Sequence, residues 1–208
     1  ARDSVPHSHS PIDIALIRYG PPALLLAPSW LRKGVFPKGE SPIRLAIMTI
    51  GWGGPFVMLG AMGMRTIEAS LFGPLVPGLL PMVVAFWGLA VDGARIRAGR
   101  WIGLCFIALA VGLILGPPAL AGDTGFLLGA PWLLAAGAGW SAFTLAFRRT
   151  GLSGIESAAY VCLYSTPFLI LAALIFGSNI DSYSMRDVAS LTLVQGVLSG
   201  AVAFGTYG

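Results

Sequence analysis

The residue types that most often perform catalysis are few in this sequence, and their spacing does not pair them. The two histidines, His7 and His9, both precede the first apolar segment. The two cysteines, Cys105 and Cys162, lie inside apolar segments, where packing is a better role for them than a disulfide framework or a zinc site. The chain has no paired carboxylates and no phosphate-binding glycine loop followed by lysine. The sequence therefore predicts no cofactor, no metal site and no enzymatic activity.

The tripeptide Asp123-Thr124-Gly125 has the sequence found at the active site of aspartic proteases. That chemistry requires a second carboxylate close to the first, and the tripeptide occurs once in this chain. Asp123 stands directly before a long apolar segment, and aspartate is a preferred N-cap residue of helices. We therefore expect the tripeptide to begin a helix.

A second group of residues could line a binding cavity. Trp52 and Trp140 lie near the middle of apolar segments, and Ser141 and Gln195 are polar groups within such segments. A cavity with aromatic walls and scattered hydroxyl groups suits a small organic solute better than a bare ion. A glutamine in hydrocarbon is costly unless it is hydrogen-bonded or wet, so we expect Gln195 to face the cavity. Core packing is the alternative role for both tryptophans.

Arg18 is the cation that lies inside a long apolar segment, 12–31. Ionisable residues within a membrane are functional candidates because their burial is costly. The alternative is that the side chain extends to the outer interface or pairs with Asp13.

All of these candidates except the histidines and Asp123 lie in segments long enough to cross a membrane. A membrane-spanning helix needs about 20 apolar residues. Charged residues make up 11% of the chain, whereas soluble domains carry about 25%. The composition predicts an all-α, polytopic membrane protein whose partner is the lipid bilayer. Its uncharged stretches are 45–64, 69–91, 101–122, 124–147, 157–180 and 188–208.

The basic residues predict how the chain crosses the membrane. We expect seven helices, at 12–31, 45–65, 67–91, 101–118, 126–148, 156–177 and 188–207. The loops at 32–44, 92–100 and 148–155 hold nine Lys and Arg residues, and the remaining loops hold two. Because Lys and Arg mark the cytoplasmic side, these three loops should face the cytoplasm. The net charge of +4 is thus a signal of topology, and no nucleic-acid partner is predicted.

The segment 67–91 carries Pro74, Pro77 and Pro81 within eight residues, a density that should interrupt a regular helix. Interrupted helices mark binding regions in transporters, because free carbonyl groups at membrane depth must face protein or a water-filled cavity. A structural kink against a neighbouring helix is the alternative.

Two parts of the chain resemble each other at an offset of about 145 residues. The two copies would run through the membrane in opposite directions, because five predicted helices separate their starts. Inverted repeats of this kind are typical of secondary transporters. The matching segments, in order, are 12–15 with 155–158, 22–24 with 167–169, and 45–54 with 191–200.

The chain resembles the EamA-type members of the drug/metabolite transporter superfamily. The resemblance implies a fold of ten helices in two inverted five-helix repeats, of which this chain would hold helices two to eight. Residues 1–122 would be the first repeat without its first helix, and residues 123–208 the start of the second without its last two helices. Ala94 stands near the place where the family often has glutamate. The residues that carry the resemblance are Pro77, Pro81, Arg95-Ile96, Trp101-Ile102-Gly103, 110–112, 129–136, 140–144, Arg148-Arg149 and Arg18.

The expected function is transport of a small metabolite or drug-like solute across a bacterial-type inner membrane by alternating access, with or without a coupling ion. The resemblance assigns the pathway to the helices at 45–65, 67–91, 126–148 and 188–207. A membrane scaffold or subunit without transport activity is the alternative, and an intramembrane enzyme is a weaker one. The chain begins with Ala1 and ends at Gly208 inside an apolar stretch, so we expect a fragment or a trimmed form of a longer protein. The candidate residues of the pathway are Arg18, Trp52, Pro77, Pro81, Trp140, Ser141 and Gln195.

Overall fold

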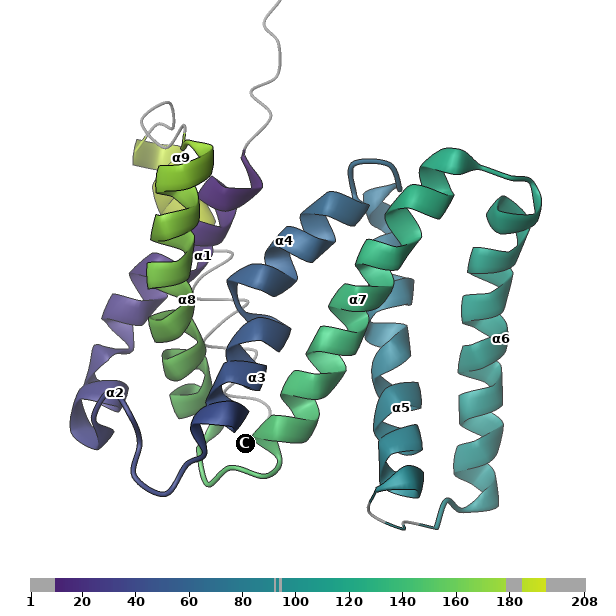
Figure 1. The fold of residues 1–208 in the computed structure, drawn as a ribbon, viewed down its shortest axis with the longest axis horizontal. Helices are drawn as coiled ribbons and strands as arrows, with labels where there is room; N and C mark the ends of the chain where they lie inside the picture. Colours follow the sequence, from purple (N-terminus) through teal and green to yellow (C-terminus); the bar gives the residue numbers. More distant parts are fainter. Residues whose placement is uncertain (1–9, 92, 94, 179–184, 194–208) are drawn as a thin grey trace, which may run out of the picture. The chain divides into compact units, whose positions relative to one another are not determined.

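The computed structural model describes residues 10–91, 93, 95–178 and 185–193, and the regular elements within them are all helices (Figure 1). The predicted all-α class is therefore confirmed. The chain forms two compact units: unit 1, which joins Ala1–Glu40 to Gly151–Gly208, and unit 2, which comprises Ser41–Thr150. Each unit contains helices from both of the predicted sequence repeats.

Five helices of the described chain are long and apolar enough to cross a membrane, which supports the predicted membrane location. They coincide with five of the seven predicted segments, and their ends differ from the predicted ones by a few residues. These candidate spans are Pro42–Gly63, Ala69–Ala90, Ala98–Leu120, Thr124–Phe147 and Gly154–Phe176.

The first predicted segment, 12–31, is two helices rather than one. Helix α1 is Pro11–Leu25, and helix α2 is Ala27–Lys33. The chain turns between them at Leu26, and Pro28 lies in the first turn of α2, where its missing N–H leaves no hydrogen bond unmade. With 15 residues, α1 is shorter than the roughly 20 residues that a straight membrane-spanning helix needs.

Unit 1 is built on α1 and on helix α8, Gly154–Phe176, which lie side by side and run in opposite directions (Figure 1). Helix α2 also contacts α8. Helix α9, Met185–Leu191, contacts α1. It overlaps in sequence with the first residues of the predicted segment 188–207, and from 194 onward that segment lies outside the described residues.

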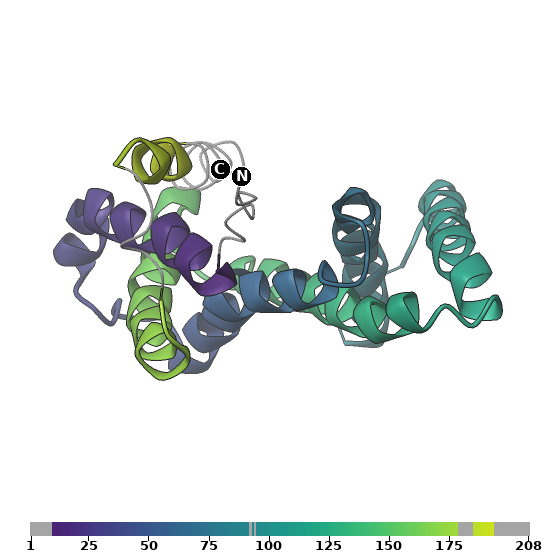
Figure 2. The same ribbon diagram turned by 90° about the horizontal axis from the view of Figure 1, so that it is seen from above.

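Unit 2 is organised around one long helix, α7. This helix contacts α3, α4 and α5, whereas α6 packs mainly against α5 and stands at the edge of the unit (Figure 2). The elements of unit 2 are α3 Pro42–Trp52, α4 Gly54–Gly63, the 3-10 helix η1 Ala69–Leu71, α5 Phe72–Ala90, α6 Ala98–Leu120 and α7 Thr124–Phe147.

The start of α7 confirms the prediction for the Asp123-Thr124-Gly125 tripeptide. Asp123 is the N-cap residue, and its Oδ1 accepts a hydrogen bond of 3.0 Å from the backbone N–H of Phe126. The carboxylate thus satisfies one of the free N–H groups in the first turn of the helix.

Most basic residues of unit 2 lie at one end, as their alternation along the sequence predicts. The start of α3, the end of α5, the start of α6 and the end of α7 lie at this end, and the turns with Arg65 and with Asp123 lie at the opposite end (Figure 1). In unit 1 the 33–40 segment meets the start of α8, since the backbone N–H of Gly151 donates a 2.7 Å hydrogen bond to Glu40.

Glycines let the backbones of unit 2 come into direct contact. A Cβ added to Gly51 in α3 would lie 2.2 Å from the carbonyl oxygen of Gly139 in α7, and one added to Gly137 would lie 2.7 Å from a methyl carbon of Leu79 in α5. Gly112 and Gly116 have the G-x-x-x-G spacing that is common where membrane helices pack closely. They behave differently, because a Cβ at either residue would have no neighbour within 4 Å among the described helices. Close helix packing therefore depends on α7 and not on α6.

We expect Gly51→Ala to destabilise unit 2 by about 1–3 kcal/mol, because the new methyl group would overlap a backbone oxygen that cannot rotate away. Gly112→Ala is the matched control, and it should leave the stability unchanged or raise it by up to about 1 kcal/mol, since alanine favours the helix. Thermal unfolding of the purified protein in detergent measures both changes. Equal unfolding temperatures for the two variants would contradict the α3–α7 contact.

Candidate functional site

The predicted pathway residues of unit 2 centre on a pair of tryptophans. The ring centroids of Trp52 and Trp140 lie 4.5 Å apart. Trp52 is also stacked on Phe56 at 5.1 Å and on Phe143 at 5.8 Å. The structure thus brings Trp52 and Trp140 into contact.

The contact between the two tryptophans lies beside two glycines. Gly51 precedes Trp52 and Gly139 precedes Trp140, and a Cβ added to Gly51 would overlap the carbonyl oxygen of Gly139. The indole rings thus lie next to a close approach of the α3 and α7 backbones. Both tryptophans are half-buried, so part of each ring remains accessible at the surface of unit 2.

The backbone is interrupted beside Trp52. Helix α3 ends at Trp52 and α4 begins at Gly54, so the membrane segment Pro42–Gly63 turns at Gly53. The N–H of Gly53 still donates to the carbonyl of Thr49 at 2.8 Å. An interruption of this kind is tolerated at membrane depth only where protein or a water-filled cavity faces it.

The predicted interruption at Pro77 and Pro81 is wrong, because both prolines lie within one continuous helix, α5. Pro74 is in its first turn, where a missing N–H has no cost, and each later proline removes a single hydrogen bond, which a helix can absorb by bending. Pro77 and Pro81 are half-buried on this helix. Of the two alternatives considered for these prolines, a kinked helix against a neighbour is the one compatible with α5.

Ser141 lies next to Trp140 but is completely buried. Its hydroxyl donates a 2.8 Å hydrogen bond to the carbonyl of Gly137, one turn earlier in α7. Thr144 and Thr49 donate in the same way, to Trp140 and Leu45. These hydroxyl groups thus satisfy their donor capacity within their own helices.

Arg18 belongs to unit 1 and so lies outside the tryptophan cluster of unit 2. It is half-buried on α1, and its guanidinium carbon lies 5.8 Å from the ring centroid of Tyr19. Gln195 falls outside the described residues, so its predicted place in the cavity stays a prediction.

Polar contacts join the two ends of the α8 segment to α1 and to α2. At one end the Ser178 hydroxyl donates to the carboxylate of Asp13, which is fully buried. At the other end the Lys33 ammonium lies 2.7 Å from Glu156, and this hydrogen bond holds the pKa of Lys33 above its usual value. The hydroxyl of Tyr160 donates to the Gly34 carbonyl at 2.8 Å beside this ion pair.

Sequence reasoning did not identify Phe56 and Phe143 as neighbours of the two tryptophans, nor the contact of Asp13 with Ser178. Phe56 and Phe143 follow Trp52 and Trp140 by four and three residues, a helical spacing that could have indicated a shared face. The contact of Asp13 with Ser178 joins residues far apart in the chain, and no local pattern signals it.

No protein-family model, curated protein or solved structure matches this chain. The assignment of a function therefore depends on the chemistry and geometry of the chain itself.

We expect Trp140→Ala to destabilise unit 2 by about 2 kcal/mol. This is less than the roughly 3–5 kcal/mol for a fully buried aromatic residue, because Trp140 is half-buried. Trp132→Ala is the control on the same helix; Trp132 is exposed, so its loss should shift the unfolding temperature little. If both variants have the same unfolding temperature as the wild type in detergent, the aromatic cluster does not stabilise unit 2.

Proposed function

We propose that this protein is an integral membrane transporter of the EamA type, which moves a small metabolite or drug-like solute across a bacterial-type inner membrane by alternating access between inverted repeats. The proposal includes seven membrane segments, of which five are long and apolar enough in the described chain. The single observation that carries it is the symmetry of the contacts that α8 and Ser178 make with Asp13 of α1 and Lys33 of α2.

These two polar contacts are equivalent under the predicted repeat. At an offset of about 145 residues, Asp13 corresponds to Glu156 and Lys33 corresponds to Ser178. Asp13 contacts Ser178, and Glu156 contacts Lys33. When a two-fold axis relates two copies, a contact from one residue to another must recur with the roles of the copies exchanged.

The directions of the helices fit the same symmetry. Because α1 and α8 are antiparallel and in contact, an axis relating them would pass between them, perpendicular to both. For helices that cross a bilayer, such an axis lies in the membrane plane, as in inverted-repeat transporters. Antiparallel packing by itself brings the start of each segment beside the end of the other. The repeat adds that the residues in contact, Asp13 with Ser178 and Glu156 with Lys33, are those that correspond at the sequence offset.

The interrupted segment in unit 2 supports a solute pathway. Discontinuous helices mark the substrate-binding region of many transporters, near the middle of the bilayer. Here the interruption at Gly53 lies directly beside Trp52, which contacts Trp140. Aromatic faces at such a position can hold a flat or cationic organic solute. The proposed pathway combines this pair with Gln195 and the helices at 45–65, 67–91, 126–148 and 188–207.

A second candidate function is that of a membrane scaffold or subunit without transport activity. The observation that favours it is the packing of Trp52 against Phe56, Phe143 and Trp140, which fills space with protein rather than with solute. An accessibility experiment separates the two functions without knowledge of the substrate.

The experiment uses Gln195→Cys in a chain whose native cysteines are replaced by alanine, reconstituted into liposomes. Alternating access predicts that a membrane-impermeant maleimide labels position 195 when added from outside and, in a separate sample, when enclosed inside. A scaffold predicts labelling from neither side. Phe106→Cys on the exposed face of α6 is the control and should stay unlabelled in lipid. Absence of labelling at position 195 from both sides would refute the transport proposal.

Gln195→Leu should reduce transport at least several-fold without reducing expression or the unfolding temperature, because the pathway would lose its amide while keeping a side chain of similar size. The measurement is uptake of radiolabelled amino acids and organic cations into proteoliposomes, with Ser141→Ala as the comparison. Ser141 bonds within its own helix, so that variant should transport normally. Wild-type uptake by Gln195→Leu would remove this residue from the pathway.

The topology follows from the same proposal. Cysteine introduced at Lys38 should be protected from an impermeant reagent outside intact cells, and cysteine at Asp123 should react, because the basic loops face the cytoplasm. Permeabilised cells, in which both positions should react, provide the control. Reaction at position 38 but not at position 123 would reverse the orientation.

A further inference from the structure

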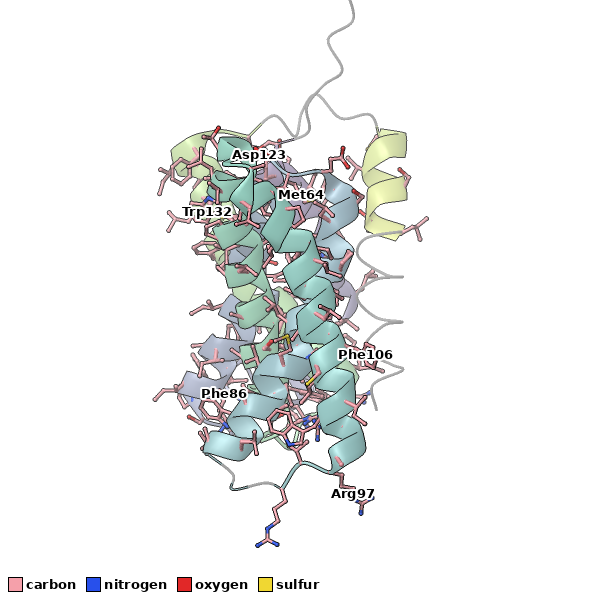
Figure 3. The ribbon with its side chains drawn as sticks, turned by 90° about the vertical axis from the view of Figure 1, so that its right-hand side faces the viewer. Met64, Phe86, Arg97, Phe106, Asp123 and Trp132 are labelled. Atoms are coloured by element: carbon pink, nitrogen blue, oxygen red, sulfur yellow. The ribbon has the colours of Figure 1, made fainter. Side chains whose placement is uncertain are left out.

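Helices α5 and α6 enclose an apolar groove of about 250 Å³ at the edge of unit 2. Its walls are made by Met82, Phe86 and Leu89 of α5 and by Trp101, Leu104 and Cys105 of α6, together with alanines from both helices. The groove faces outward, since Phe86 is 72% and Trp101 is 48% exposed (Figure 3). Only 6% of the most apolar stretch of α6 is buried inside the protein, so in a bilayer most of this helix would contact lipid.

One end of this groove is cationic. Arg97 is the N-cap residue of α6 and Arg100 lies in its first turn, directly before Trp101. Arg95 precedes them in the same loop, and all three arginines are exposed. Figure 3 shows Arg97 at the end of the helices, beyond the groove residue Phe86. The site thus places positive charge beyond the end of an apolar wall, with an indole ring between the two.

This distribution matches an anionic phospholipid. An acyl chain is apolar along its length, and its phosphate carries negative charge at the membrane surface. Tryptophan favours the level between these two regions, which is where Trp101 lies. The loop at 92–100 is predicted to face the cytoplasm, where the leaflet is rich in anionic lipids and basic pockets between helices bind their headgroups.

The lining of the groove also suits a lipid chain. The walls of the groove are apolar along their length, as an acyl chain requires. A flexible acyl chain can enter a narrow groove lined by methionine, aromatic and alanine side chains.

We propose that the α5–α6 groove is a binding site for an anionic phospholipid, in which an acyl chain lies against Phe86, Leu104 and Trp101 and the phosphate is bound by Arg97 and Arg100. The site requires that α5 and α6 cross the membrane, but it does not depend on whether the protein transports a solute.

The test measures lipid binding to the delipidated, purified full chain in mild detergent by native mass spectrometry. Phosphatidylglycerol should bind about 10-fold more tightly than phosphatidylcholine with the same acyl chains. The double variant Arg97→Gln/Arg100→Gln should weaken phosphatidylglycerol binding by roughly 10- to 30-fold, because each arginine contributes a factor of about ten or less to the affinity. Binding of phosphatidylcholine should not change. Arg65→Gln, at the opposite end of unit 2, is the charge-matched control and should have no effect.

A second pair of variants tests the groove itself. Ala108→Phe should fill the cavity and weaken binding of both lipids, whereas Leu113→Phe, on the exposed side of α6 outside the groove, should change neither. Unfolding temperatures equal to that of the wild type establish that the variants fold.

Three results would overturn the proposal. The first is equal affinity for the two lipids. The second is that inorganic phosphate binds at Arg97 and Arg100 at the same concentration as phosphatidylglycerol. The third is a dimer that Ala108→Phe dissociates while lipid binding persists, because a second copy of the chain would then occupy the groove.

Discussion

The structure of unit 2 depends on close contact between helix backbones, which only glycine permits. In hydrocarbon the hydrophobic effect does not drive helices together, so packing and polar contacts must stabilise their association. On α7, Gly129 faces Thr66, Gly137 faces the carbonyl of Val76, and Gly139 faces Gly51. One helix thereby contacts three helices that precede it in the unit, and the positions of α3, α4 and α5 follow.

The same packing explains how an interrupted membrane segment can persist. The turn at Gly53 keeps its backbone groups bonded, since the N–H of Gly53 donates to Thr49 and its carbonyl accepts from Val57. Trp52, directly before the turn, packs against Phe56 and Trp140. Structural support and a solute-binding surface are compatible here, because a half-buried indole ring can pack on one side and remain accessible on the other.

Unit 1 uses polar contacts where unit 2 uses glycines. Helix α1 is short and buries a carboxylate, Asp13, which would be costly to leave without a partner. The Ser178 hydroxyl donates to it, and the ion pair of Lys33 with Glu156 joins α2 to the start of α8. In unit 2, Arg97 and Arg100 likewise place charge at the end of an apolar helix.

The sequence alone determined the properties that depend on composition and on local chemistry. The lengths of the apolar segments set the helical class and most of the candidate spans, the spacing of Lys and Arg set which helix ends lie together, and Asp123 set the start of α7. Each of these follows from the preference of a residue for lipid, for water or for a helix terminus, which needs no distant partner.

The tertiary structure decided which glycines, prolines and aromatic residues matter. Gly51 and Gly139 form a contact whereas Gly112 and Gly116 do not, although the latter pair has the better-known spacing. The interruption lies at Gly53 rather than at Pro77 and Pro81, because a helix can absorb the loss of single hydrogen bonds. The meeting of Trp52 with Trp140 and of Asp13 with Ser178 depends on contacts across long separations in the chain, and local sequence patterns carry no record of which surfaces will face each other.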